Sequence, residues 1–123
     1  MDTGISFTSR QQVNEHLTAR HMGSGDLPVL ATPAMIALME NAAMNCVLPH
    51  LKEGETTVGS MIESSHLRPT PLGGEVRATA TLTAIDGRKL TFRVEASDAN
   101  GLIGEGSHVR YIVHRERFLE KLK

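Results

Sequence analysis

Alternating side chains in two neighbouring segments constrain the fold more than any other feature of the chain. Within residues 76–84 and 90–96, every second side chain is apolar and those between are mostly threonine, arginine, glutamate or serine. A period of two is typical of β-strands that bury one face. Asp86-Gly87 lies between the segments and predicts a tight hairpin turn. The chain therefore contains an antiparallel pair whose apolar face must be covered by another element.

The flanking segments predict further strands of the same sheet. Residues 103–113 follow a turn marked by Asp98, Asn100 and Gly101, so three consecutive strands form a meander. Residues 57–67 also favour a strand, and a leading strand is expected within residues 5–19. Residues 21–28 are rich in turn-forming residues and predict a loop.

One long helix is predicted between the leading strand and the meander. Thr32 can act as its N-cap, and Pro33 follows at the first helical position, where a missing N–H costs nothing. The run to Leu48 is rich in alanine, methionine and leucine, and Pro49 ends it. An apolar helix packed across about five antiparallel strands gives an α+β fold. Residues 1–123 are enough for one domain of this kind.

Charge and cysteine content exclude several classes of protein. The chain has 13 basic and 14 acidic residues, largely interspersed, which is no footprint for nucleic acid. The charged run at 115–123 is expected to be a solvated end. Cys46 is the only cysteine, so no intrachain disulfide can form. With no signal peptide and no membrane-length apolar run, a cytoplasmic location is expected.

Glu40 is anomalous within the predicted helix. Its neighbours three and four residues away are Ile36, Ala37, Ala43 and Met44, and the helix contains no lysine or arginine to pair with it. Glu40 could lie at the edge of the apolar stripe and face solvent. Alternatively, it could lie in an apolar cleft, where burial would raise its pKa and a nearby cation would lower it. A carboxylate tuned in this way can act as a base or nucleophile.

Other polar residues have both structural and functional explanations. Helix capping accounts for Thr32 by itself, although its hydroxyl also lies where free helix N–H groups favour an anion. His66 is one of six histidines, and the alternation does not decide whether its face meets the helix. His108 and His114 could share a strand face, but no further ligand has suitable spacing, so no metal site is expected.

Several short motifs occur in a specific order. Ala31-Thr32-Pro33 precedes Glu40 by seven residues, and Gly54-Glu55-x3-Gly59 precedes His66 by seven. A proline-containing turn at 69–73, the hairpin at 86–88 and the segment 104–110 follow. This arrangement resembles hot-dog-fold thioesterases of the fluoroacetyl-CoA thioesterase type over residues 29–118. The resemblance implies a hot-dog fold with one long central helix.

The resemblance also implies a site and an assembly. Thr32, Glu40 and His66 would be catalytic, Gly59 would donate its N–H to the thioester oxygen, and Arg110 would lie near the substrate. The family forms dimers with the active site between subunits, which would bring Glu40 and His66 into one cleft. No metal or bound cofactor is implied, because coenzyme A arrives as part of the substrate.

The implied reaction is hydrolysis of an acyl thioester. Glu40 would attack the carbonyl or activate a water, Thr32 would hydrogen-bond Glu40 or the oxyanion, and His66 would polarise the carbonyl or transfer protons. One departure concerns residues 21–30, which are short and lack the phenylalanines that form a lid in the fluoroacetyl-specific member. A general acyl-CoA or another small acyl thioester is therefore the expected substrate.

Two other functions fit the same fold. A non-catalytic domain could bind acyl-CoA or a hydrophobic ligand, and a hot-dog dehydratase would act on CoA or carrier-protein substrates. Free thiol would indicate hydrolysis, an enoyl thioester would indicate dehydration, and neither would indicate a binding protein. The sequence leaves the acyl group open, and also the choice between a homodimer and a tetramer formed by back-to-back sheets.

Overall fold

The predicted hairpin forms the centre of a curved antiparallel sheet. The computed structural model describes residues 1–123. Strands β3 (Glu75–Asp86) and β4 (Lys89–Asp98) pair up to Asp86 opposite Lys89, and Gly87 adopts a φ of 60° in the turn between them. Strand β5 (Gly101–His114) returns beside β4, so the predicted three-strand meander is confirmed.

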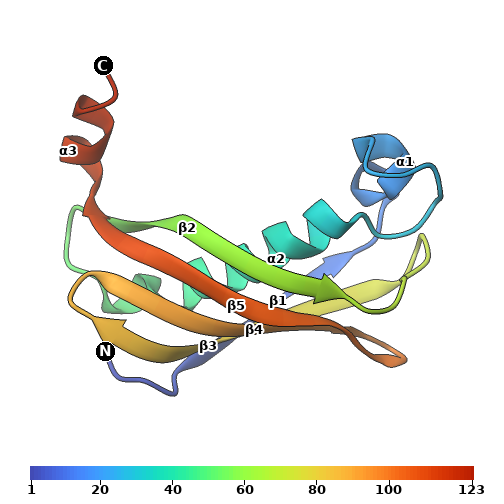
Figure 1. The fold of residues 1–123 in the computed structure, drawn as a ribbon, viewed down its shortest axis with the longest axis horizontal. Helices are drawn as coiled ribbons and strands as arrows, with labels where there is room; N and C mark the ends of the chain where they lie inside the picture. The colour runs from blue at the N-terminus through green and yellow to red at the C-terminus, as the bar shows by residue number, and fades with distance from the viewer.

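Two further strands form the edges of this sheet. Strand β1 (Ser6–Gln12) pairs with β3, and strand β2 (Glu55–His66) pairs with β5, giving the order β1-β3-β4-β5-β2 with every pair antiparallel. Figure 1 shows β2 along the open side of the sheet. Because β2 is an edge strand, one side of its backbone has no strand partner within the chain.

Helix α2 (Thr32–Val47) packs against the concave face of the sheet and supplies much of the core. The apolar side chains of β3 and β4 that were predicted to face inward are at most 1% exposed at positions 76–82 and 90–96. Ala84 was placed on the same face but is exposed, because a register shift between Leu82 and Ala84 ends the alternation. The predicted α+β hot-dog architecture, with one long helix and five antiparallel strands, is confirmed.

The start and end of α2 differ in detail from the sequence prediction. Ala31 is the N-cap, Thr32 is the first helical residue and Pro33 the second. No side chain caps this end, so the capping role predicted for Thr32 is wrong. At the other end, the helix continues as a 3-10 turn, η2 (Leu48–His50). Pro49 fits there because a first-turn residue needs no N–H partner.

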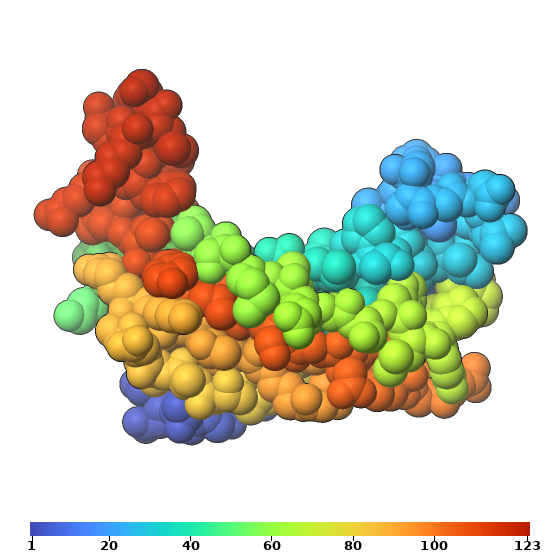
Figure 2. All heavy atoms as spheres, in the orientation of Figure 1, coloured from blue at the N-terminus to red at the C-terminus, as the bar shows by residue number.

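Short helices border the sheet at both ends of α2. The segment after β1 forms a 3-10 turn, η1 (Glu15–Leu17), and one turn of helix, α1 (Ala19–Met22), where a loop was predicted at 21–28. Helix α3 (Arg115–Glu120) follows β5. Figure 2 shows α1 and α3 rising on either side of a hollowed surface above β2 and α2. None of the helices is long and apolar enough to span a membrane.

Candidate active site

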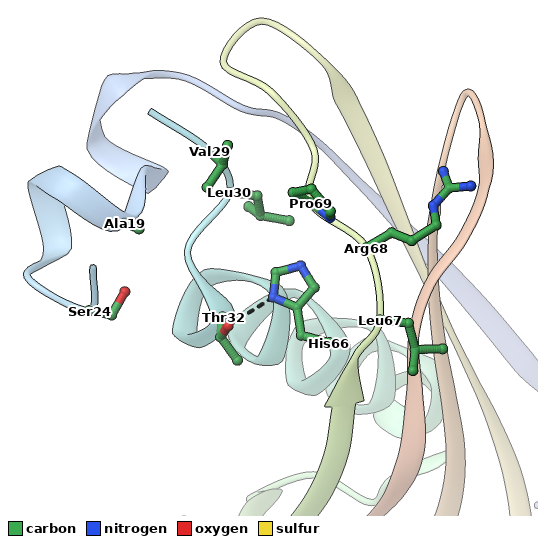
Figure 3. A pocket seen from close by; sticks show the side chains of 9 residues that line it. All are labelled: Ala19, Ser24, Val29, Leu30, Thr32, His66, Leu67, Arg68 and Pro69. Atoms are coloured by element: carbon green, nitrogen blue, oxygen red, sulfur yellow. Dashed lines mark hydrogen bonds between the residues drawn. The ribbon is translucent and has the colours of Figure 1, made fainter. Parts of the chain in front are cut away.

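Thr32 and His66 meet where the start of α2 lies beside the end of β2. The Thr32 hydroxyl lies 2.8 Å from His66 Nδ1 (Figure 3). On the same strand, the Ser64 hydroxyl contacts the sulfur of Met39 on α2 at 3.6 Å. The face of β2 that carries His66 is therefore the face that meets the helix, which the alternation alone had left open. The hydroxyl that was expected to cap α2 is hydrogen-bonded to the imidazole instead.

The second nitrogen of His66 is buried without a hydrogen-bond partner. Burial lowers the pKa of His66 below its ordinary value, and the main chain of Arg68 offsets this only in part. The imidazole is therefore neutral at pH 7. It lines a hollow of about 270 Å³ with Thr32, Leu30 and Pro69 (Figure 3). A buried nitrogen without a partner can exchange a hydrogen bond or a proton with a ligand in this hollow.

The segment after His66 is anchored by a buried carboxylate. Asp98, 5% exposed, accepts hydrogen bonds from the Thr70 hydroxyl at 2.8 Å and the Asn100 N–H at 2.8 Å, and Arg68 lies at 3.3 Å. Burial alone would raise the pKa of Asp98, but these hydrogen bonds and the charge of Arg68 hold it below its ordinary value. Asp98 thus joins the wall of the His66 hollow to the turn between β4 and β5.

Glu40 lies two turns further along α2 and belongs to a second hollow. Eight residues of helix separate it from Thr32, which is about 12 Å along the axis. Its side chain is 40% exposed, and Oε2 lies 3.8 Å from Nη1 of Arg110 on β5. The apolar cleft considered from the sequence is not formed. Glu40 lies at the edge of the apolar stripe of α2, beside the guanidinium of Arg110 on β5.

Arg110 is held in place by buried hydrogen bonds. It is 7% exposed, and its Nε donates to the Thr57 hydroxyl at 2.8 Å while Nη2 donates to the Thr57 carbonyl at 3.0 Å. Nη1 lies 3.3 Å from Nε2 of His108 and 3.8 Å from Oε2 of Glu40. Burial lowers the pKa of Arg110, and the charge of Glu40 opposes that shift. Each guanidinium nitrogen therefore has an assigned neighbour, and the group cannot rotate freely.

His108 has a defined protonation state because of its two neighbours. A guanidinium can only donate, so Nε2 of His108 accepts from Arg110, and Nδ1–H donates to the Met61 carbonyl at 2.7 Å. Burial lowers the pKa of His108, and the positive charge of Arg110 adds to that effect. The sequence prediction missed both His108 and Thr57 as parts of this network. The two-residue spacing of His108 and Arg110 on one strand face was the available signal.

Gly59 lies against the Glu40 carboxylate at an irregular point of β2. The register with β5 shifts between Gly59 and Met61, so Ser60 is an extra residue in the edge strand. A Cβ added at Gly59 would lie 2.8 Å from Glu40 Oε2 and 3.3 Å from His108 Cε1. Only glycine allows the strand and the carboxylate to approach this closely.

The structure therefore divides the predicted site residues into two groups. Thr32 and His66 share one hollow, whereas Glu40 and Gly59 border another of about 230 Å³, and Arg110 lies beside Glu40. A single chain does not place these groups around one cavity. No cluster of three or more histidine, cysteine, aspartate or glutamate side chains is placed to hold a metal ion.

Comparison with known proteins gives consistent matches. Residues 13–116 match the model of the fluoroacetyl-CoA-specific thioesterase family. The whole chain aligns with 93% of the fluoroacetyl-CoA thioesterase of Streptantibioticus cattleyicolor at 37% identity. A solved structure of a fluoroacetyl-CoA thioesterase is 38% identical and superposes with a TM-score of 0.92, covering 99% of this chain and 95% of that one.

More distant structures extend the likeness of fold. A thioesterase superfamily member from Thermus thermophilus is 32% identical with a TM-score of 0.91, over 98% of this chain and 90% of that one. A hot-dog-like protein from Thermanaerovibrio acidaminovorans is 22% identical with a TM-score of 0.90, over 99% and 90% of the two chains. At that identity the second match supports the fold alone.

Proposed function

Because the chain belongs to the fluoroacetyl-CoA-specific thioesterase family, we propose that it hydrolyses acyl-CoA thioesters at a site formed by Thr32, Glu40 and His66. The structural observation that carries the proposal is the bond between Thr32 and His66, which leaves a buried imidazole nitrogen free for a ligand. Water adds to the acyl carbon, the bond to sulfur breaks, and coenzyme A leaves as its thiol. The groups that act on these atoms belong to the chain, so the proposal requires no metal or bound cofactor.

The proposed roles follow from the position of each group and from the neutral state of His66. Glu40 is the only carboxylate that borders the hollow at Gly59, so it either attacks the carbonyl or takes a proton from the attacking water. Neutral His66 transfers protons or polarises the carbonyl through its free nitrogen. In this proposal the Thr32 hydroxyl donates to His66 Nδ1, which orients the ring and leaves its proton on Nε2. The N–H of Gly59 is the proposed oxyanion donor, supported by its place in an irregular edge strand beside Glu40.

Arg110 has an electrostatic role in this proposal. Its Nη1 lies 3.8 Å from the Glu40 carboxylate and orients that group. The Arg110 side chain is 8% exposed and that of Glu40 is 40% exposed, so water screens this interaction from the Glu40 side. Thr57 and His108 hold the guanidinium in position. Arg110 therefore acts on the substrate mainly through Glu40.

The proposed active unit is a homodimer formed through β2. This strand of 12 residues is an open sheet edge, and Met61 at its middle is 42% exposed. Pairing two β2 strands antiparallel, about an axis between residues 62 and 63, places His66 of one protomer opposite Gly59 of the partner subunit. That pairing unites the two groups of site residues. A tetramer would require a further contact through the uncovered faces of the sheets.

The substrate proposal is general rather than fluoroacetyl-specific. The segment before α2 contains no aromatic residue between His21 and Leu30. A variant of the solved fluoroacetyl-CoA thioesterase is known in complex with acetyl-CoA, so the site of that variant holds an acyl-CoA without fluorine. We propose that short acyl-CoAs are the substrates here, and that the protein acts in the cytoplasm, as the single free Cys46 suggests. Fractionation of the native host would test the location.

Thiol release from a panel of short and medium acyl-CoAs tests the activity. Wild type should hydrolyse at least one of them, and Glu40→Gln and His66→Ala should each lower kcat by about 10²–10⁴-fold. Glu53→Gln and His50→Ala are matched controls, because both residues are exposed, lie outside β2 and border neither hollow. Binding of acyl-CoA without turnover would favour a binding protein, and formation of an enoyl thioester would favour a dehydratase.

Subunit complementation tests the dimeric site. Light scattering should give a mass twice the 13.4 kDa of the chain. After subunit exchange, an equal mixture of Glu40→Gln and His66→Ala should recover about a quarter of the wild-type rate, because half the dimers are mixed and each has one intact site. No recovery in a mixture shown to exchange subunits would place Glu40 and His66 of each site on the same chain.

A further inference from the structure

His108 is a buried titratable residue that takes no part in the reaction proposed above. It is 1% exposed, and its ring lines the hollow of about 230 Å³ that Glu40 and Gly59 also border. Burying an imidazole is costly unless its nitrogens find partners. Here Nδ1–H donates to the Met61 carbonyl at 2.7 Å, and Nε2 lies 3.3 Å from Nη1 of Arg110. Both nitrogens are therefore in use, each towards a different strand position.

The contact between His108 and Arg110 falls on the end of the guanidinium that faces Glu40. Nε and Nη2 of Arg110 are held by the hydroxyl and carbonyl of Thr57, at 2.8 and 3.0 Å. Nη1 has only His108 Nε2 at 3.3 Å and Glu40 Oε2 at 3.8 Å. Contacts along one edge of a planar group still let the opposite end tilt. The bond to His108 therefore fixes where Nη1 lies relative to the Glu40 carboxylate.

Only a neutral His108 can accept this bond. A guanidinium has five N–H donors and no acceptor, so Nε2 must offer a lone pair. A proton on Nε2 would remove the bond and place two positive groups side by side. Because Thr57 continues to hold Nε and Nη2, the end that would move is Nη1. The imidazolium would also become a second donor that competes with Arg110 for Glu40.

Two charges act on His108, and they oppose each other. Arg110, on the same strand, disfavours a proton on the ring, whereas Glu40, on α2, favours it. Burial has the largest effect, and together with Arg110 it lowers the pKa of His108 below its ordinary value of 6.5. The ring is therefore neutral at pH 7 and gains a proton in the acid range.

The other elements packed against His108 add no charge. Strand β2 presents the Met61 carbonyl, and β4 presents the ring of Phe92, whose centroid lies 6.0 Å away. His66 shares the helix-facing side of β2, but it pairs with Gly104, four residues from His108 and thus about 13 Å away along β5. Within one chain, the two histidines are therefore separate titrating groups.

We propose that His108 is a positioning residue for hydrolysis, and that turnover requires its neutral imidazole as the acceptor that holds Arg110 Nη1 beside Glu40. The proposal rests on the acyl-CoA hydrolase function. It adds to the proposed catalytic groups a residue that acts on the substrate only through Arg110 and Glu40. The proton that His108 can bind is not transferred in the reaction, so its binding lowers the rate by displacing Nη1.

Two amide substitutions separate the roles of the two ring nitrogens. Glutamine places an amide oxygen near the position of Nε2 and keeps an acceptor for Arg110 that cannot be protonated. Asparagine places its amide near Nδ1, keeps a donor for the Met61 carbonyl and leaves Nη1 without that acceptor. At pH 8, His108→Asn should lower kcat for an acyl-CoA at least about tenfold with KM within about twofold, whereas His108→Gln should stay within about threefold of wild type. Equal losses in the two variants, or a change confined to KM, would overturn the proposal.

The dependence of kcat on pH distinguishes positioning from packing. Below pH 6.5, the slope of log kcat against pH should be shallower in His108→Gln than in wild type, by as much as about one unit, because one inactivating proton has been removed. His50→Gln is the matched control, because His50 is exposed and borders neither hollow, and it should keep the wild-type slope. Circular dichroism at each pH confines the comparison to folded protein. The same slope in His108→Gln and wild type would refute the proposal.

Nitrogen-15 NMR of the histidine rings tests the arrangement in the wild-type protein, whether or not the variants fold. At pH 7, His108 should be neutral, with its proton on Nδ1 and with Nε2 as an acceptor. A proton on Nε2, or a cationic ring, would overturn the proposal even if the acyl-CoA is hydrolysed. If wild type hydrolyses no acyl-CoA, the hydrolase function is overturned, whereas a neutral ring with Nδ1–H would still support His108 as the acceptor for Arg110.

Discussion

Replacing Thr57 with valine tests whether Arg110 is held as the structure indicates. Thr57 and Arg110 are 6% and 7% exposed, and the hydroxyl accepts from Arg110 Nε at 2.8 Å. Valine keeps the shape of threonine but leaves that N–H without an acceptor. A hydrogen bond to a charged group contributes about 1.5–3 kcal/mol, so the free energy of unfolding should fall by about that amount. The bond from Nη2 to the Thr57 carbonyl uses the main chain and should persist.

Urea unfolding at fixed protein concentration measures this effect, because association through β2 would make stability depend on concentration. Thr57→Ser keeps the hydroxyl and should retain most of the stability that valine loses. Thr56→Val is the neighbouring control, since Thr56 bonds nothing in the network. Thiol release should also fall in Thr57→Val, because Arg110 no longer orients Glu40. A Thr57→Val protein within about 0.5 kcal/mol of wild type would refute the buried network.

Three further predictions concern other parts of the site. The unfolding free energy should fall as the pH drops below 6.5, because burial lowers the folded-state pKa of both His66 and His108 from that value and the unfolded chain then binds more protons. Each histidine contributes at most about 1.4 kcal/mol per pH unit, and a flat profile between pH 7 and 5 would contradict this. Gly59→Ala should lower thiol release at least about tenfold, because the new Cβ would lie 2.8 Å from Glu40 Oε2 and force that carboxylate to move, whereas Ser107→Ala, at an exposed position of β5 that borders neither hollow, should leave thiol release unchanged. Asp98→Asn should reduce stability by about 1.5–3 kcal/mol in thermal or urea unfolding, since a buried anion with three donors is lost, and wild-type stability would show that the anchor is dispensable.

The meander was predictable because each inward-facing residue is identified by its nearest neighbours. Alternation around Asp86 locates two strands and their buried faces without any knowledge of distant residues. The same logic identified the span of α2 from its composition. Thr32 was interpreted as a cap for the same reason, and that interpretation was wrong. Its hydroxyl bonds His66, 34 residues away, and no local pattern reports such a partner.

The environment of Glu40 was hidden from the sequence for a related reason. The helix contains no cation, so the carboxylate looked unpaired, whereas Arg110 reaches it from a strand 70 residues further along the chain. The register of β2 against β5 brings Thr57, His108 and Arg110 together, and register depends on the whole sheet. The resemblance did identify the family and the enzyme class correctly. It depends on the order and spacing of short motifs along the chain, and these can be read without knowing which distant residues are in contact. The roles of the site residues stay predictions.

The strand order has a consequence for how this protein folds. The meander joins strands that follow one another directly, whereas β1 must find β3 some 70 residues later and β2 must find β5 some 50 residues later. Contacts between distant segments form slowly, because the intervening loop loses entropy before any pairing stabilises it. We therefore expect β2 to join a meander that has already formed. Since β2 carries both Gly59 and His66, catalytic competence in a refolding experiment should appear only in the slowest phase.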